Sequence, residues 1–255
     1  MIMGILNLTP DSFSDGGEHF SKKNALEHAY HLIDSGADMI DIGGESTRPG
    51  SDPITAEEEL ERIIGTVKEL APTVSIPISV DTTKPLVAGL SLEAGASMIN
   101  DISGLRDDRM IDTAISYDAP VVIVHMHGTP KTFETDFMDG GALKEIKRFL
   151  GERAEYAVSR GMKEKNIIVD PGVGFGKTAE QDMHIIKNSG SFSDKYPVLI
   201  GPSRKRFVLQ YYGGMDRDDA TAAVSKAAAD SGARILRVHN VSKVASVLGP
   251  NHLSS

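Results

Sequence analysis

Short apolar runs that each end in a polar residue recur along this chain, and they constrain its fold more than any other feature. The eight runs are Ile2–Leu6 before Asn7, Met39–Ile42 containing Asp41, Ile76–Val80 before Asp81, Ser97–Ile99 before Asn100, Val121–Val124 before His125, Ile167–Val169 before Asp170, Val198–Ile200 before the 201–205 stretch, and Ile235–Leu236 before Arg237. Strands buried on both faces read as near-continuous apolar runs, whereas surface antiparallel strands alternate. Polar residues at the carboxyl ends of such strands mark the reactive face of an α/β barrel. The pattern therefore predicts a site where the strand ends converge.

The segments between these runs have the spacing of amphipathic helices. Thr55 and Glu58 form a capping box before a helical stripe, and Pro85 suits the first turn of another helix. Three stretches, 35–41, 94–100 and 231–237, share one design in which a helix ends, a glycine follows and a short strand begins. Alternating strands and helices indicate βαβ units and a parallel sheet.

The length of 255 residues fits one α/β barrel. We therefore predict a single (β/α)8 TIM barrel with parallel strands, as one domain over 1–255, in preference to an open sheet. The first strand begins beside Met1, and only Val241 to Leu248 remain for the last helix. We expect a barrel shortened at both termini.

Composition narrows the classes of partner. The formal net charge is −9 and the basic residues are scattered, which argues against nucleic-acid binding but leaves an anionic small substrate open. The chain has no cysteine, so disulfides and thiolate ligands are excluded. It has no apolar run of about 20 residues and no opening signal segment. We expect no membrane association and a cytoplasmic location.

Acidic and amide side chains form the first group of candidate site residues. Asp81 and Asp170 each end a buried strand, where a carboxylate needs a partner. They either pair structurally with Lys or Arg, or read a guanidine-like ligand edge through two parallel hydrogen bonds. Asn100 both donates and accepts, which suits the edge of a heterocycle.

Cationic side chains form the second group. Arg237 and His239 are two apart on one strand and so face the same way, and Arg48 lies on a loop at the same end of the barrel. An arginine fork matches phosphate oxygens, so we favour an anion site over plain ion pairing. Lys205, after the seventh strand, is expected to donate hydrogen bonds to a ligand.

Long polar connections follow the first two strands, at 8–20 and 43–53, and we interpret them as lids. The glycine-rich stretch 170–178 is not a phosphate-binding P-loop, because Pro171 stands where that motif needs glycine. Its glycines predict a tight turn past a ligand, with Phe175 at the tip. His125 and His127 could begin a zinc site, but the first and last strands lack the usual further ligands of such hydrolases.

Seven motifs in order give the chain a close resemblance to the dihydropteroate synthase family. They are MGILNLTPDSFSDGG (3–17), DIGGESTRPG (41–50), SVDT (79–82), INDI (99–102), DPG (170–172), SRK (203–205) and RVH (237–239). The resemblance spans nearly the whole chain. A departure is His127, which stands where the family usually has glutamine.

The resemblance implies a transferase of folate biosynthesis, and hence a sulfonamide target. Such an enzyme joins 4-aminobenzoate to 6-hydroxymethyl-7,8-dihydropterin diphosphate, giving 7,8-dihydropteroate and pyrophosphate by a dissociative, SN1-like reaction that Mg²⁺ assists. A homodimer stays open, because the family often dimerises near the end where this chain has a short helix.

The resemblance also implies a role for each matching residue. It assigns Asp81, Asn100, Asp170 and Lys205 to the pterin, and Asn7, Arg48, Arg237 and His239 to the diphosphate, with Asn7 near the metal. It assigns Phe13, Thr47, Arg48, Pro49, Phe175 and Ser203 to the aminobenzoate pocket. The residues expected to carry the catalytic step are Asp81, Lys205, Arg237 and His239. Asp41 is interpreted as structural beneath the 47–48 loop.

Three alternatives remain at this point. A methyltetrahydrofolate-type methyltransferase shares the fold and binds a pterin, but it has no diphosphate for the cations to neutralise. A pterin-binding protein without catalysis is the second alternative, and a zinc hydrolase based on His125 and His127 is the third.

Overall fold

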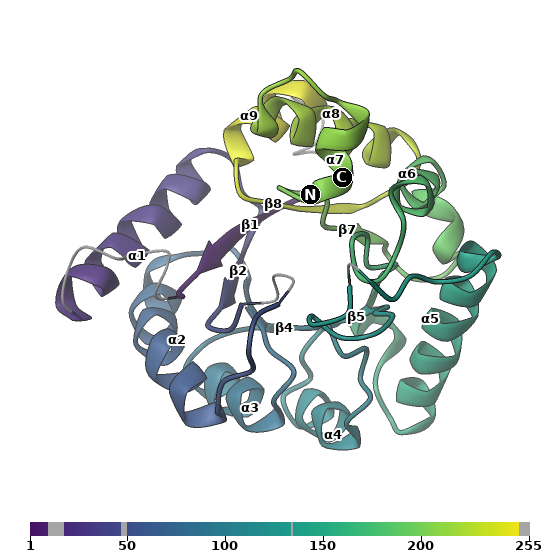
Figure 1. The fold of residues 1–255 in the computed structure, drawn as a ribbon. Helices are drawn as coiled ribbons and strands as arrows, with labels where there is room; N and C mark the ends of the chain where they lie inside the picture. The colour runs from purple at the N-terminus through teal and green to yellow at the C-terminus, as the bar shows by residue number, and fades with distance from the viewer. Residues whose placement is uncertain (10–17, 47–49, 134, 250–255) are drawn as a thin grey trace.

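Eight parallel strands form the centre of the computed structural model, which describes residues 1–9, 18–46, 50–133 and 135–249 (Figure 1). The strands are β1 (Ile2–Asn7), β2 (Met39–Gly43), β3 (Ile78–Asp81), β4 (Met98–Asp101), β5 (Val121–Val124), β6 (Ile167–Asp170), β7 (Leu199–Ile200) and β8 (Ile235–Val238). Their order is β6-β5-β4-β3-β2-β1-β8-β7. A parallel bridge between Val169 and Val198 joins the two ends of this order. The predicted TIM barrel is confirmed.

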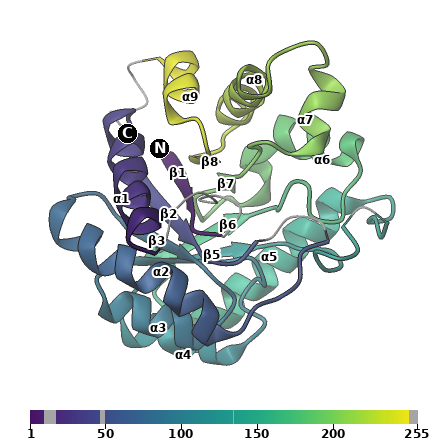
Figure 2. The same cartoon turned by 60° about the vertical axis from the view of Figure 1, so that its left-hand side comes forward.

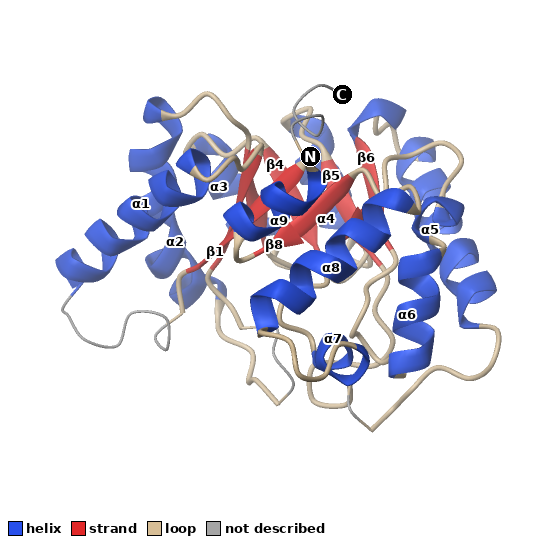
Figure 3. Ribbon diagram, turned by 90° about the horizontal axis from the view of Figure 1, so that it is seen from above, coloured by secondary structure: helices blue, strands red, loops and turns tan. Residues whose placement is uncertain are grey.

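Helices surround the strands in the described part of the chain (Figure 3). They are α1 (Glu18–Asp34), α2 (Ala56–Leu70), α3 (Pro85–Glu93), α4 (Asp108–Ser116), α5 (Ala142–Ser159), α6 (Ala179–Lys187), α7 (Arg206–Tyr211), α8 (Arg217–Asp230) and α9 (Val241–Leu248), with short 3-10 turns at Ala71–Thr73, Glu164–Asn166 and Ser189–Phe192. Helices α8 and α9 lie beside each other, and α9 packs against β1 (Figure 2). No helix among these is long and apolar enough to cross a membrane.

The local signals read from the sequence act as expected. Thr55 and Glu58 make both bonds of a capping box at α2, and Pro85 opens α3. Gly36, Gly95 and Gly232 take φ of 99°, 109° and 100°, the left-handed geometry that follows a helix end. These three glycines confirm the reused helix–glycine–strand module. A second capping box joins Thr178 and Gln181 at α6.

Alternation along the strands divides the barrel interior into an apolar floor and a polar mouth. Met3, Met39, Met98 and Ile235 belong to a separate buried cluster, together with Val122, Val124 and Leu199. Successive side chains of a strand face opposite sides, so residues two positions further along share the same face. These positions are Asp41 after Met39, Asn100 after Met98 and Arg237 after Ile235. Along each of these strands, the side chains that face the barrel interior therefore change from apolar to polar toward the carboxyl end.

Gly95 offers a test of the helix-ending glycines. A Cβ there would lie 2.5 Å from the Ala71 Cβ, at φ of +109°. Gly95→Ala should therefore lower the free energy of unfolding by about 2–4 kcal/mol, through left-handed strain and a steric clash. The control is Gly151→Ala within α5, where a Cβ meets nothing within 4 Å. That change should be neutral or stabilise by up to about 1 kcal/mol. Urea unfolding of both variants measures the difference, and equal stabilities would contradict this account.

Candidate active site

Four strand ends bring together the acids and the arginine that the sequence predicted. Arg237 of β8 donates from Nε to Asp41 Oδ2 at 2.5 Å and from Nη2 to Asp81 Oδ2 at 2.6 Å. Asn100 of β4 donates from Nδ2 to Asp41 Oδ2 at 3.0 Å. Parallel pairing of β2, β3 and β4 sets these side chains in adjacent rows. The mouth of the barrel is therefore one connected polar network.

The charges in this network shift each other's ionisation. Burial raises the pKa of Asp81 to about 7, although Arg237 opposes the shift, and the neighbouring acids Asp41, Glu59 and Asp101 add to it. Burial opposes the charge of Arg237, but Asp41 and Asp81 outweigh it and raise its pKa. The arginine is thus a permanent cation between two carboxylates.

The structure adds to two interpretations drawn from the sequence. Arg237, which the sequence favours as an anion-binding cation, is ion-paired with Asp41 and Asp81. Asp41, interpreted as structural, is 0% exposed and contacts both Arg237 and Asn100, while the 47–48 loop lies outside the described residues. Sequence separation hid the contact, because Asp41 and Arg237 are 196 positions apart in the chain.

Two buried oxygens in the network have no hydrogen-bond partner among the described residues. They are Asn100 Oδ1 and Asp41 Oδ1. An unpaired buried acceptor costs about 1–3 kcal/mol, so such atoms are rare without a functional reason. A ligand with N–H groups on one edge would supply donors to such acceptors.

Asp170 and Lys205 occupy the opposite part of the mouth. Asp170 is 6% exposed, its Oδ1 accepts the amide of Gly172 at 2.7 Å, and burial raises its pKa. Lys205 donates from Nζ to the carbonyl of Val173 and lies 4.1 Å from the centre of the Phe175 ring. Burial lowers the pKa of Lys205 to about 8, which the acids Asp170 and Asp182 partly oppose.

Ser203 and His239 are directly coupled. Ser203 Oγ accepts the backbone amide of His239 at 3.1 Å and lies 2.8 Å from its Nδ1. The sequence assigned these residues to separate ligands. Their contact means that a change at Ser203 also reaches the imidazole.

Asn7 ends β1 beside Gly43, the partner of both Asn7 and Asp81 in the sheet register. A Cβ at Gly43 would lie 3.5 Å from the Asp81 Cβ and 3.6 Å from Asn7 Oδ1. Glycine therefore leaves space between an amide oxygen and a carboxylate at the rim. Phe13, Thr47, Arg48 and Pro49, also predicted as site residues, lie outside the described residues.

Sequence reasoning missed an ion cluster that ties down the start of the 43–53 connection. Lys84 Nζ contacts Glu45 Oε2 at 2.5 Å and Glu59 Oε2 at 2.6 Å. Arg62 donates to the carbonyl of Gly44 at 2.8 Å. The signal available in the sequence was the position of Glu59 at helical spacing from Ile63 and Val67. The structure shows Glu59 at 0% exposure on that buried face.

His125 and His127 have different surroundings. His125 is buried, its Nδ1 lies 3.1 Å from Lys177 Nζ, and burial together with that cation lowers its pKa to about 2. His127 Nε2 instead lies 3.2 Å from Asp136 Oδ1. Groups of three or more His, Asp or Glu suited to a metal do not occur among the described residues.

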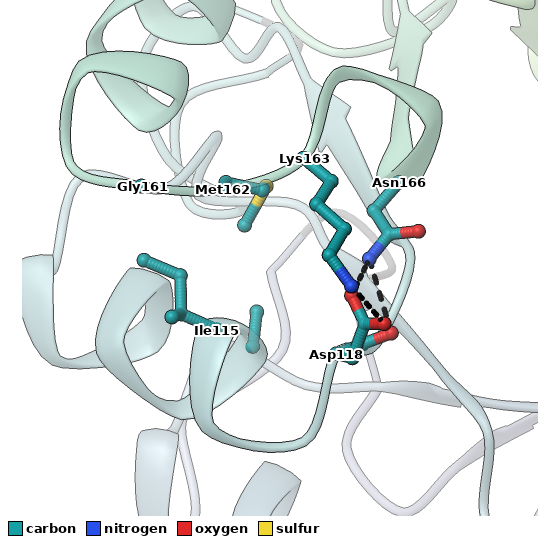
Figure 4. A pocket seen from close by; sticks show the side chains of 7 residues that line it. Ile115, Asp118, Gly161, Met162, Lys163 and Asn166 are labelled. Carbon is teal, nitrogen blue, oxygen red and sulfur yellow. Dashed lines mark hydrogen bonds and ion pairs between the residues drawn. The ribbon is translucent and has the colours of Figure 1, made fainter.

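A pocket with a volume of about 100 Å³ lies at the other end of the barrel (Figure 4). Its lining comes from the end of α4 and from the segment between α5 and β6, which precede strands rather than follow them. Asp118 there already pairs with Lys163 at 2.5 Å and with Asn166 Nδ2 at 2.8 Å. This pocket is separate from the polar mouth.

Comparisons with known proteins identify the class that this fold and site define. The family model described as "Pterin binding enzyme" matches residues 3–239. A dihydropteroate synthase of Streptococcus pyogenes is 42% identical over 246 residues, covering 94% of this chain and 90% of that protein. The chain belongs to the pterin-binding enzyme family, as its motifs predicted.

Solved structures agree with this assignment. The dihydropteroate synthase of Xanthomonas albilineans with 4-aminobenzoic acid has a TM-score of 0.90 and 38% identity, covering 97% of this chain and 90% of that one. The Yersinia pestis dihydropteroate synthase with a sulfonamide drug complex has a TM-score of 0.90 and 37% identity, covering 97% and 91%.

The lowered pKa of Lys205 predicts a pH-dependent stability. Its folded pKa of about 8 lies below its ordinary value of 10.5, so between these values the unfolded chain binds more protons. Stability should therefore rise with pH over this window, and the cost of the charged lysine should be constant below it. Relative to Lys205→Met, the wild type should gain roughly 1–3 kcal/mol from pH 7 to pH 10.5. Urea unfolding at several pH values measures this, and a difference independent of pH would contradict it.

Proposed function

We propose that this chain is a dihydropteroate synthase, a transferase of folate biosynthesis. It joins the amine of 4-aminobenzoate to the methylene of 6-hydroxymethyl-7,8-dihydropterin diphosphate and releases pyrophosphate. The observation that carries the proposal is the polar mouth itself, where unpaired acceptors on Asn100 and Asp41 lie beside a fixed arginine. The 42% identity to a dihydropteroate synthase over 94% of the chain supports it.

The acidic part of the mouth suits the pterin. The N–C(NH₂)–N edge of a pterin is guanidine-like, and a carboxylate reads such an edge through two parallel hydrogen bonds. Asp170 and Asp81 offer carboxyl groups, and Asn100 Oδ1 is a buried acceptor without a protein partner. Lys205 adds a donor from above the glycine loop. These four residues form the proposed pterin site.

The cationic part suits the diphosphate. The carboxylates Asp41 and Asp81 engage Nε and Nη2 of Arg237, and neither uses its Nη1 group. A diphosphate would therefore meet an arginine already oriented, with His239 two positions further on the same chain segment. Arg48 and Asn7 complete the proposed set.

Magnesium fits the donor chemistry at the rim. Mg²⁺ usually binds one or two protein oxygens together with substrate phosphates, and Asn7 Oδ1 lies at the rim next to Gly43. Asn7 would hold the ion, with the diphosphate supplying further oxygens. When bound, the ion neutralises charge on the departing diphosphate.

The aminobenzoate would lie against Phe175 and Ser203 at the outer edge. The Phe175 ring packs against Phe133, with ring centres 5.0 Å apart, and presents an apolar wall to an arene. Phe13, Thr47, Arg48 and Pro49 complete this proposed pocket. The Yersinia pestis relative, solved with a sulfonamide drug complex, supports the proposal that this chain is a sulfonamide target.

The reaction we propose is dissociative. The bond between the methylene carbon and the diphosphate oxygen breaks first, and its electron pair leaves with pyrophosphate. Arg237 and His239 stabilise the negative charge that develops there, while an ionised Asp81 favours the positive charge on the pterin methylene. The neutral arylamine then forms the C–N bond and loses one proton. The long loops at 8–20 and 43–53 would exclude water from the cation.

The proposal also covers the domain organisation, the location and the class of substrate. We propose one pterin-binding domain over 1–255, a cytoplasmic location and small-molecule substrates rather than nucleic acid or membrane. The scattered basic residues and net charge of −9 support the choice of substrates. A homodimer stays a prediction.

A direct assay tests the function. The protein is incubated with the pterin diphosphate, labelled 4-aminobenzoate and Mg²⁺, and we expect labelled dihydropteroate and one pyrophosphate per product. A methyltransferase or a non-catalytic binding protein would form neither product. Absence of both from well-folded protein, under conditions where a known dihydropteroate synthase is active, would overturn the proposal.

The two halves of the mouth predict a matched pair of variants. Arg237→Met should weaken binding of the pterin diphosphate about 100-fold, because a charge-assisted contact is lost, and that of the pterin alcohol by at most about tenfold, through Asp81, which loses its ion-pair partner. Asn100→Ala should weaken both ligands equally, by about tenfold. Calorimetric titration of both ligands, after thermal melts verify folding, measures this. Equal losses for both ligands in Arg237→Met would refute the division.

A further inference from the structure

Lys177 is a buried lysine that the proposed reaction does not use. It is 4% exposed and lies in the connection from β6 to α6. Its Nζ donates to the carbonyls of Gly172 at 2.8 Å and Phe175 at 3.0 Å, and it lies 3.4 Å from the carbonyl of His125. Burying an ammonium group is costly unless it is paired and hydrogen-bonded, so this arrangement requires a reason.

The loop around Lys177 needs an internal support. Gly172, Gly174 and Gly176 all have positive φ, at 67°, 78° and 67°. A Cβ at Gly172 would lie 1.9 Å from the carbonyl oxygen of His125, and one at Gly176 would lie 2.3 Å from that of His127. The loop therefore passes very close to the end of β5. The carbonyls of Gly172 and Phe175 each accept one backbone amide, from Phe175 and His127, and Lys177 supplies a second donor to each.

A second buried group holds the same loop from the other side. Asp182 of α6 is 2% exposed, and its Oδ1 accepts the amide of Gly174 at 2.7 Å. Burial lowers the pKa of Lys177 to about 7 and raises that of Asp182 to about 7, while each group's charge opposes the other's shift. Lys177 Nζ also lies 3.1 Å from Nδ1 of His125, whose pKa burial lowers to about 2. The Lys177 amine on two carbonyls and the Asp182 carboxyl on the Gly174 amide thus hold the loop from two sides.

The loop in turn carries two contacts of the proposed site. The carbonyl of Val173 accepts from Lys205, and the Phe175 ring lies under the same ammonium at 4.1 Å. Gly174 also packs against the Lys205 stem, where a Cβ would lie 2.8 Å from Cδ. A residue that holds the 172–176 loop in place therefore also positions the Phe175 ring and the Val173 carbonyl that accepts from Lys205.

We infer that Lys177 is a positioning residue, which holds the 172–176 loop so that Phe175 forms one wall of the aminobenzoate pocket. The part of this inference that names 4-aminobenzoate rests on the proposed function. Three of the four proposed pterin residues, Asp81, Asn100 and Asp170, end strands, and two of the four, Asp170 and Lys205, also contact the loop at Gly172 and Val173. Loss of Lys177 should therefore affect the two substrates unequally.

Lys177→Met tests this, since it keeps the stem and removes every donor. We expect the KM for 4-aminobenzoate to rise at least about tenfold, and that for the pterin diphosphate to change less than about threefold. Hydrogen exchange should accelerate in peptides covering 170–178 and stay unchanged in the strands. Lys177→Gln, which keeps two N–H donors, should show a smaller effect of the same kind. Lys163→Met controls for the substitution, because Lys163 is exposed and lies at the far end of the barrel.

The outcomes separate this inference from the proposed function. Unchanged kinetics and exchange in Lys177→Met would overturn the positioning role, as would an equal rise in both KM values. Failure of both Lys177 variants to fold would also overturn it, by showing that the lysine supports the barrel as a whole. If the wild type forms no dihydropteroate, the proposed function fails, while the exchange measurement still decides whether Lys177 holds the loop.

Discussion

The arginine that β8 places between two carboxylates organises the mouth of this barrel. Arg237 binds Asp41 and Asp81 from strands that are distant in sequence, and Asp41 in turn receives the amide of Asn100. Each buried acid would be costly alone, and removing one partner of such a set typically costs about 3–5 kcal/mol. The acids stay buried because the arginine is there, and the arginine is oriented because the acids are there. Lys205 and Asp170 complete the mouth from the opposite part of the barrel.

The network is incompletely satisfied, and this has a functional consequence. Asn100 Oδ1 and Asp41 Oδ1 are buried without partners in the described structure. An unpaired buried acceptor costs about 1–3 kcal/mol, and a ligand that donates to it would recover that cost on binding. The proposed pterin has such donors on one edge. The same side chains therefore contribute to the stability of the fold and to the proposed binding site, so a change at Arg237 should affect both.

In the loop from β6 to α6, the sequence predicted the role of the glycines but not that of the lysine. Its spacing excluded a phosphate-binding loop, and its glycines predicted a tight turn, which the positive φ values of Gly172, Gly174 and Gly176 confirm. The lysine among these glycines carried no sequence signal for its role. Only the fold shows it buried against carbonyls of its own loop and of the β5 end.

The sequence by itself determined the strands, the helix caps and the rows of residues that face the barrel interior. These follow from local physics: a period of two, a capping box at Thr55, and glycines after helix ends. It also singled out Asp81, Asn100, Asp170, Lys205 and Arg237 by their position at strand ends. Only the tertiary structure decided which of them pair, because the contact between Arg237 and Asp41 depends on closing β1 against both β2 and β8. The same closure brings Ser203 into hydrogen-bond contact with His239, and Asp41 into contact with Arg237 and Asn100.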